Sequence, residues 1–461
     1  MTSRPIRRFL PVMLAASTLA ACATVPEIEP QTAVDAPPAY SAALPEAGLA
    51  DDWWEGFGDP VLDALVERGL AANLDITAAR DRVRAAEALL RAERSDLLPR
   101  VDGAADVGVT AGEGDDGSFA SAGLFVLFDP DLSGRLSAEI RAAAARYAQA
   151  DYIRADTRRI VAAAIASQYV EYRRTGAQLE LLQESTALQE QTLDVVTLRY
   201  EAGLAANLDV RRAAADLAQT QARRGLLEID RAEAAHALAL LLAEAPGTFL
   251  PEGESGIGSI PSYAEGPALG QPADLLRRRT DILAAEARLQ EAAAAVGIEQ
   301  ADLRPSLTVP ASIVLGGGGI DDLFGEFLAS VGAALDLPIF DGGRRHAEVE
   351  AAEAELDARY AEYRLTFLDA LGETENALVA IGAFRQRAIA LSEAIEQSEA
   401  ALEQSNALYR EGLASLFDVL DAQRQLISSR ESLLDNLAAL SNAHIALHLA
   451  AASQGPQLDQ T

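Results

Sequence analysis

The sequence predicts a mainly α-helical fold with a small β part, in which long antiparallel coiled-coil helices are combined with four strands per chain. Three observations support this class. Long stretches consist of Ala, Leu, Glu, Gln and Arg, and aromatic residues make up only 5% of the 461 residues, which favours long helices over a compact mixed core. Apolar residues recur at coiled-coil spacing over many turns. The same order of segments also occurs twice, which predicts an internal tandem duplication.

The N-terminal residues 1–21 are predicted to be a lipoprotein signal peptide. Three arginines among the first eight residues precede an apolar run at 9–21, which is too short to span a bilayer as a mature helix. The run ends in Leu-Ala-Ala-Cys, and Cys22 is the only cysteine of the chain. This ending resembles the bacterial lipobox, whose cysteine is lipidated and becomes the first mature residue. An ordinary signal peptide followed by a chance cysteine is the alternative.

Composition and the repeat predict how the rest of the chain is divided. Five prolines among small residues predict an extended tether at 22–50, which acyl chains on Cys22 would anchor firmly. Ala23 favours outer-membrane sorting, by the same resemblance to lipoproteins. The predicted parts that follow are a first structural repeat at 51–244, a Pro- and Gly-rich linker at 245–270, a second structural repeat at 271–452, and a C-terminal tail at 453–461.

Two pairs of matched segments reveal the duplication. The phrase RYEAGLAANLDVRR at 199–212 matches LYREGLASLFDVLD at 408–421, with Tyr, Gly-Leu and Asp-Val at positions 209 residues apart. The segments 73–101 and 279–307 match at an offset of 206. Each half therefore contains a helix, a strand pair marked by Pro, a long helix, the Gly-Leu phrase and another helix. We refer to 199–212 and 408–421 as the Gly-Leu phrases.

The long helices show narrow apolar seams. An uninterrupted helix over 135–202 would be on the order of 100 Å long. Steps of three, four and seven residues are typical of coiled coils rather than of the broad apolar face of a globular helix. In the second half the seam consists of Leu356, Tyr360, Tyr363, Phe367, Leu371, Leu378 and Ile381.

Alternating segments predict the strands. Residues 306–315 and 327–340 each place apolar side chains on one face, and 101–109 with 119–128 form a weaker pair in the first half. Strands of about ten residues with one apolar face suit a transmembrane barrel, although a soluble hairpin is the alternative. Four strands cannot close a membrane barrel, so several copies of the chain would have to share one sheet.

The Gly-Leu phrases predict hairpin tips. Gly203 and Gly412 each stand where one seam stops and the next begins, so we interpret them as helix C-caps. Leu204 and Leu413 then lie at the tips.

Carboxylates follow these glycines. Asp418 and Asp421 are three residues apart and so share one face of the next helix. They could cap that helix or, in a symmetric assembly, form an acidic ring that binds cations or pairs with Arg211 and Arg212.

Five features together resemble the outer-membrane efflux proteins of the TolC type, specifically their NodT-like lipoprotein branch. They are the lipobox, WWEGFGDPVLDALV (53–66), RTDILAAEARL (279–289), LPIFDGGRRHAEVEAAEAEL (337–356) and the Gly-Leu phrases. The resemblance covers nearly all of the mature chain. Thr280 departs from it, because this branch usually has Pro there, and we expect the substitution to loosen that helix start without changing the fold.

The resemblance implies a homotrimer with a twelve-stranded transmembrane β-barrel, continued by an α-helical barrel through the periplasm. It implies that Asp418 and Asp421 line a closed periplasmic constriction and that Asp209 belongs to the gating network. The tips at Gly203, Leu204, Gly412 and Leu413 would dock a periplasmic adaptor, which joins the duct to an inner-membrane pump. The expected location is the cell outer membrane, with a lipid anchor at Cys22 and a long periplasmic extension.

Other classes of function have less support. A net charge of −32 argues against nucleic-acid binding. The run GGGG at 316–319 lacks the Lys-Ser/Thr of a phosphate-binding loop, and we expect no cofactor. His444 and His448 have the spacing of a metal pair, but no acid or thiol lies near them in sequence, so we interpret them as core residues and expect no metal. Trp53 and Trp54 are predicted to pack the end of the tether onto the body.

Three functions remain from the sequence. The leading one is a passive exit duct of a tripartite efflux system. The second is a periplasmic coiled-coil adaptor lipoprotein, which the strand pair in each half disfavours. The third is a lipid-anchored surface enzyme, which the absence of any catalytic constellation in the sequence disfavours.

Overall fold

The computed structural model describes residues 27–41, 52–110, 117–247, 259–263, 271–317 and 324–451. The predicted signal peptide, Cys22, most of the linker and the C-terminal tail lie outside these ranges. The chain forms two compact units. Within the described residues, unit 1 comprises those in 27–34, 80–153 and 281–366, and unit 2 comprises those in 35–79, 154–280 and 367–451. Each unit therefore combines segments from both halves of the sequence.

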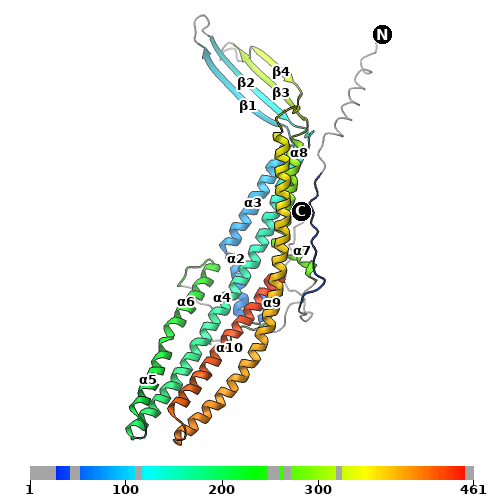
Figure 1. Ribbon diagram of the computed structural model, residues 1–461. Coiled ribbons are helices and arrows are strands. Elements are labelled where there is room, and N and C mark those ends of the chain that lie inside the picture. The colour runs from blue at the N-terminus through cyan, green and yellow to red at the C-terminus, as the bar shows by residue number, and fades with distance from the viewer. Residues whose placement is uncertain are drawn as a thin grey trace, which may run out of the picture. The chain divides into compact units, whose positions relative to one another are not determined.

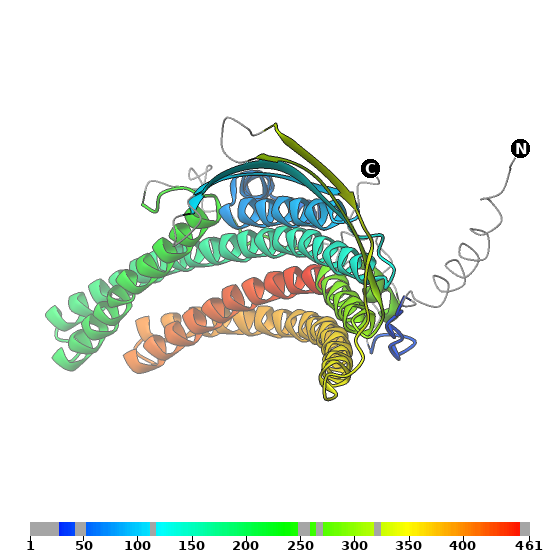
Figure 2. The ribbon, with the colours of Figure 1, turned by 90° about the horizontal axis from the view of Figure 1, so that it is seen from above.

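Unit 1 contains one antiparallel sheet. Its strands are β1 (Arg100–Thr110), β2 (Gly117–Phe128), β3 (Ser306–Gly317), β4 (Glu326–Val331) and β5 (Ala334–Asp336). The spatial order is β1-β2-β3-β4, and β5 pairs with β3 (Figure 1). The central pairing of β2 with β3 joins the two halves of the sequence. Figure 2 shows that the sheet is curved.

The strand register gives the sheet one face that is apolar across β1, β2, β3 and β4. Val101 pairs with Val126, and Val126 pairs in turn with Ala311, which pairs with Val331. Directly opposite residues lie on the same face of a sheet. The same face therefore contains Val107, Val109, Leu124, Val309, Ile313, Leu315, Phe327 and Ala329. The other face is mixed: it contains Asp102, Asp106, Ser121, Ser312 and Ser330 together with Phe119, Phe125, Leu127, Val314 and Leu328.

The prediction of one strand over 327–340 is wrong. β4 ends at Val331, β5 ends at Asp336, and Ile339 and Phe340 belong to no strand. At the break, the N–H of Gly332 donates to the carbonyl oxygen of Pro310 at 2.9 Å. Pro310 in β3 has no N–H to return, so the regular ladder is interrupted opposite it. Ile339 and Phe340 are 90% and 92% exposed.

The helices account for most of the described residues. A short 3₁₀ turn η2 (Trp53–Phe57) precedes α2 in the first half, and η3 (Pro272–Asp274) precedes α7 in the second. The α-helices are α2 (Pro60–Ala72), α3 (Leu74–Ser95), α4 (Arg135–Glu201), α5 (Asn207–Ala222), α6 (Arg224–Leu241), α7 (Leu275–Arg278), α8 (Thr280–Ala301), α9 (Arg344–Arg410) and α10 (Leu416–Ala451).

The two halves differ after the Gly-Leu phrase. The second half has the single helix α10, as predicted, whereas the first half has two helices, α5 and α6, separated at Arg223. Gly225 in the first turn of α6 has low helix propensity, which favours an interruption there. Arg223 also forms an ion pair with Glu431 of α10 at 2.9 Å. The prediction of one helix in both halves is therefore wrong for the first half.

The predicted seam of α9 is buried or half-buried along its length. Tyr363 lies in unit 1 and is 2% exposed. Phe367, Leu378 and Ile381 lie in unit 2 and are 0%, 3% and 1% exposed. In unit 2, Leu378 and Ile381 pack with Leu447 of α10. This burial confirms the helical spacing read from the sequence.

The start of α8 is held by a side chain from α4. Thr280 is 2% exposed, and its Oγ1 donates to Oδ1 of Asp156 at 3.0 Å. Asp156 also pairs with Arg159 at 2.6 Å. The expectation that Thr280 loosens this helix start is wrong, because α8 begins at Thr280 and its hydroxyl forms a hydrogen bond that Pro could not form.

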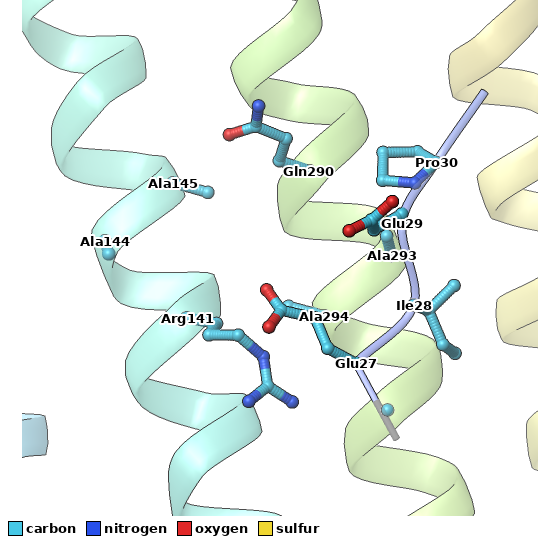
Figure 3. A pocket seen from close by; sticks show the side chains of 11 residues that line it. Glu27, Ile28, Glu29, Pro30, Arg141, Ala144, Ala145, Gln290, Ala293 and Ala294 are labelled. Carbon is cyan, nitrogen blue, oxygen red and sulfur yellow. The ribbon is translucent and has the colours of Figure 1, made fainter. Parts of the chain in front are cut away.

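Residues 27–34 run along the helices of unit 1 without forming a helix or strand. The Tyr360 hydroxyl donates to the Ala33 carbonyl oxygen at 2.9 Å. A cavity of about 400 Å³ separates residues 27–30 from small residues of α4 and α8 (Figure 3). The carboxylate of Glu27 points toward α4, from which Arg141 extends (Figure 3).

The core of unit 2 contains the two C-terminal histidines. His444 and His448 are 1% and 2% exposed. The His448 ring stacks on Trp53 with centroids 5.2 Å apart, and His444 stacks on Tyr263 at 5.3 Å. Trp53 and Trp54 are both buried, as predicted from the sequence. The two histidines are core residues of this aromatic cluster.

No described helix combines the length and the apolar composition that crossing a bilayer requires.

The buried histidine pair predicts that the free energy of unfolding decreases at acidic pH. Burial lowers the pKa of His448 to about 3 and that of His444 to about 4, with His444 and Arg385 respectively adding to the effect. An unfolded histidine titrates near 6.5, so the unfolded chain binds protons that the folded core excludes. The stability that depends on the two neutral histidines is therefore present above about pH 6.5. The free energy of unfolding decreases as the pH falls below that value. From pH 7 to 5, each histidine should contribute a loss of about 2 kcal/mol in the free energy of unfolding.

This expectation can be measured by denaturation of the solubilised protein across that pH range. The variant H444F/H448F keeps aromatic rings in the core and should lose most of the pH dependence. His236 on α6 is exposed, so His236→Gln is the matched control and should leave the dependence unchanged. An unaltered pH profile in the double variant would contradict the assignment.

Candidate functional site

The two turns that connect α4 to α5 and α9 to α10 lie at the same end of unit 2 (Figure 1). Gly203 and Gly412 both have φ of 75°, in the left-handed region. In the first turn, the N–H of Leu204 donates to the carbonyl oxygen of Arg199 at 2.8 Å, and Gly203 donates to Tyr200 at 2.9 Å. Leu413 and Gly412 form the matching bonds to Leu408 and Tyr409. Both phrases thus end a helix with a Schellman motif, which confirms the predicted C-caps.

The leucine that directly follows the glycine of each phrase is exposed at the tip. Leu204 is 69% exposed and Leu413 is 75% exposed. The valines of the phrases point the other way, since Val419 is 1% exposed and Val210 packs against the same buried cluster. Each phrase therefore fixes a turn, buries a valine and presents a leucine to the outside of the chain.

Asp418 caps the start of α10. Its Oδ2 accepts hydrogen bonds from the backbone N–H of Ser415 at 2.9 Å and from the Ser415 hydroxyl at 2.7 Å. The N–H of Asp418 points back to Ser415 Oγ at 3.4 Å. This reciprocal pattern is a capping box. The bonds from Ser415 lower the pKa of Asp418, which keeps the carboxylate charged.

Asp421, unlike Asp418, does not cap the helix. Its side chain is 67% exposed, and Arg424 of the same helix lies 4.0 Å away. Asp418 and Asp421 both face outward from α10, as their spacing predicted. Of the two, Asp421 has the carboxylate that is more available to a neighbouring molecule.

Asp209 occupies the position of Asp418 in the first phrase but has a different environment. Ala206 replaces Ser415, and the N-cap of α5 has no side-chain hydrogen bond. The Asp209 side chain is 27% exposed, and Arg212 of its own helix lies 4.0 Å away. Within one chain, Arg212 therefore pairs with Asp209 and not with the acids of the second phrase.

The structure adds a contact that sequence reasoning missed. The guanidinium of Arg199, at the end of α4, lies over the ring of Tyr409 with its carbon 4.7 Å from the ring centroid. Its Nη1 donates to the carbonyl oxygens of Tyr409 at 2.9 Å and Arg410 at 3.2 Å. Burial raises the pKa of Tyr409, Arg199 lowers it, and the charge of Asp209 raises it. Arg199 and Tyr409 thus form a contact that joins the two hairpins.

One signal in the sequence could have located this contact. Arg199 and Leu408 occupy matching positions of the two Gly-Leu phrases, 209 residues apart, and differ in charge. Other positions of the two phrases also differ in charge, such as Glu201 and Arg410, so this signal is weak.

Comparison with known proteins gives one consistent result. A family model described as "Outer membrane efflux protein" matches residues 65–244 and 272–453. Nodulation protein T of Rhizobium leguminosarum bv. viciae is 32% identical over 86% of this chain and 83% of its own. A pyoverdine export outer membrane protein of Pseudomonas aeruginosa is 30% identical over 89% of both chains.

Solved structures agree with these relatives. The outer-membrane channel OprN superposes with a TM-score of 0.85 at 28% identity, covering 93% of this chain and 99% of its own. The outer membrane protein VceC of Vibrio cholerae gives a TM-score of 0.79 at 26% identity, covering 88% of this chain and 99% of its own.

The capping box predicts that the two aspartates of the second phrase are not equivalent. Asp418→Ala removes the acceptor for the Ser415 N–H, so the first turn of α10 should fray and its amides should exchange hydrogen faster. Asp421→Ala removes an equal charge without a backbone bond and should leave this exchange unchanged. Hydrogen exchange with mass spectrometry over 415–422 checks both, and equal protection in the two variants would refute the cap.

Proposed function

Because the chain belongs to the outer membrane efflux protein family, we propose that it is the exit duct of a tripartite efflux system. It conducts substrates passively from a periplasmic adaptor and an inner-membrane pump to the exterior. The duct is a homotrimer in the outer membrane, and it needs no catalytic group or cofactor of its own. The family match over both halves of the chain speaks against the adaptor alternative.

The observation that carries this proposal is the sheet of unit 1, which has one apolar face and two open edges. Among the described strands, β1 and β4 each have their outer side unpaired. The apolar face stays exposed in the single chain, with Val109 82% and Val331 79% exposed. In a bilayer, every strand edge has to be paired, because no water is present to bond it. Pairing β1 of one copy with β4 of the next closes twelve strands when three copies meet.

The repeat supports the same ring through the helices of unit 1. Ala138, Ala142 and Ala145 of α4 are 0%, 1% and 6% exposed. A Cβ placed on Gly297 of α8 would lie 3.5 Å from the Cβ of Ala138, so α4 and α8 are in close contact.

Their counterparts 209 residues later are Ala347, Ala351 and Ala354 of α9, and all three are exposed. In the ring, this row packs against α3 of the next copy, which is the counterpart of α8. Small residues allow such close helix packing.

The tips of unit 2 supply the entrance and the docking surface. Exposed Leu204 and Leu413 suit contact with an adaptor, and Asp421 suits an acidic constriction near the ring axis. Asp418 contributes charge there while capping α10, and the Asp209 carboxylate, near Arg212 of its own helix, adds a charge at the first tip. The acidic ring would favour cations over anions.

The acidic constriction predicts a change in conductance. In planar bilayers the wild-type protein should give small, cation-selective steps. Asp421→Asn should enlarge the steps severalfold and lower their cation selectivity, because the ring loses a charge from each copy. Asp418→Asn should act in the same direction, since an amide oxygen still accepts the bond from the Ser415 N–H.

Glu411→Gln is the matched control, because Glu411 is an exposed acid at the same tip and forms no side-chain bond in the described structure. Steps that do not respond to either aspartate substitution would remove these residues from the constriction. Failure of folded protein to insert into the bilayer would instead count against the duct itself.

The lipid anchor is tested separately. Cells grown with labelled palmitate should incorporate label into the wild-type chain and not into Cys22→Ser. The mature wild-type protein should also begin at residue 22, by mass spectrometry. An unlabelled wild-type chain cleaved elsewhere would establish the ordinary signal peptide.

A further inference from the structure

The cavity between residues 27–30 and the helices α4 and α8 of unit 1 has walls of two kinds (Figure 3). Its volume of about 400 Å³ is in the range of small-molecule sites. The small side chains that line it are Ala144, Ala145, Ala293, Ala294 and Gly297. The polar and charged side chains that line it are Glu27, Glu29, Arg141 and Gln290. Groups of both charge signs therefore border one space.

Arg141 extends from α4 toward the glycine of α8. A Cβ placed on Gly297 would lie 3.8 Å from Nη2 of Arg141, so the guanidinium lies beside the part of α8 that has no side chain. Arg141 is half-buried, and it forms no ion pair or hydrogen bond with any residue that the structure describes. The Glu27 carboxylate points toward α4 and is equally without a bond to the described residues (Figure 3). A guanidinium and a carboxylate that border a cavity without bonding to each other suit a ligand with an anionic and a cationic group.

The repeat does not reproduce this arrangement. Arg141 corresponds to Glu350 at the offset of 209, and Gly297 corresponds to Arg91 at the offset of 206. Both counterparts are exposed. The row of alanines occurs in both halves, so close helix packing accounts for the alanines. It does not account for an arginine beside a glycine, which occurs in the α4 and α8 pair that residues 27–30 cover.

The cavity lies near the ends of the helices that connect to the sheet. Arg141 is six residues from the start of α4 and Gly297 is four residues from the end of α8, which correspond to about 9 Å and about 6 Å of helix. The headgroup layer on each side of a bilayer is about 5–8 Å thick. If the sheet spans the membrane, the cavity is therefore at the level of the periplasmic headgroups. Cys22, the predicted lipid anchor, precedes Glu27 by five residues, which is at most about 18 Å of extended chain.

We propose that this cavity binds the phosphoethanolamine headgroup of a phospholipid in the inner leaflet of the outer membrane. Arg141 binds the phosphate, because a guanidinium donates paired hydrogen bonds to phosphate oxygens. Glu27 accepts hydrogen bonds from the ammonium group, and the charge of Glu29 disfavours a headgroup that is only anionic. An acyl chain in this cavity would remove the charged groups from water without pairing them. The inference rests on the proposed function, which places the sheet in the outer membrane.

Native mass spectrometry of the full-length protein in detergent, with added lipid, tests the site. Phosphatidylethanolamine, phosphatidylcholine and phosphatidylglycerol with the same acyl chains are compared, because the choline nitrogen has no N–H to donate. Phosphatidylethanolamine should bind as a single lipid per chain and about tenfold more tightly than the other two. Equal binding of phosphatidylethanolamine and phosphatidylcholine would overturn the assignment.

Variants of the cavity connect the binding to its residues. Arg141→Gln and Glu27→Gln should each weaken phosphatidylethanolamine binding about tenfold, and Arg141→Lys should restore part of it because the charge remains. Ala144→Leu keeps every charge but fills the cavity, so it should also weaken binding. Arg359→Gln and Glu350→Gln are the matched controls on α9, since Arg359 pairs with acids of its own helix and Glu350 is exposed. Wild-type affinity in Arg141→Gln, or equal losses in the controls, would contradict the site.

Soluble phosphoethanolamine separates a membrane lipid from a free phosphate compound. Added at the same concentration as the lipid, it should leave the bound lipid in place, because it lacks the acyl chains that remain in the detergent. Displacement of the lipid would assign the cavity to a soluble ligand and overturn the proposal.

The outcomes also distinguish this inference from the proposed function. Normal conductance without lipid binding that depends on Arg141 would retain the duct and reject the site. Lipid binding that depends on Arg141, in folded protein that forms no channel, would retain the site and reject the duct.

Discussion

Every residue of an edge strand presents an N–H and a C=O that water or another strand has to satisfy, and the sheet of unit 1 has two such edges, at β1 and β4. The sheet also exposes an apolar face that continues across all four long strands. In water, this combination would favour aggregation. In a lipid bilayer, the apolar face is satisfied at once, and only closure with other copies satisfies the edges. The need to pair these edges is the physical basis for the proposal that the chain forms one part of a ring.

The helices of unit 1 also have a surface that is covered in one half of the chain and exposed in the other. α4 buries its row of alanines against α8 of the same chain, whereas the matching row of α9 remains exposed. In the proposed ring, the exposed row of α9 would form with the next copy the kind of interface that α4 forms with α8 inside the chain. The two interfaces would differ at the positions where the sequences of the two halves differ.

The tips show such a divergence. Ser415 and Asp418 form a capping box at the start of α10, but Ala206 and Asp209 do not form one at α5. Arg199 reaches across to Tyr409, while its counterpart Leu408 has no charge. An acidic residue at these positions can therefore cap a helix, as Asp418 does, or present an exposed charge, as Asp421 does. The neighbouring side chains decide which of these roles it has.

Local sequence patterns were sufficient to predict the features that depend on residues close to one another along the chain. Coiled-coil spacing gave the long helices, alternation gave the strands, and Gly203 and Gly412 marked the helix ends, because each signal lies within a few turns. The matched phrases also located Asp418 and Asp421 on one helical face. The tertiary structure decided what depends on residues distant in sequence. Pro310 interrupts the strand that faces it. Asp156 accepts a hydrogen bond from Thr280 at the start of α8. Arg199 contacts Tyr409, which lies 210 residues later in the sequence. Such pairs leave no local pattern, because folding alone brings their atoms within bonding distance.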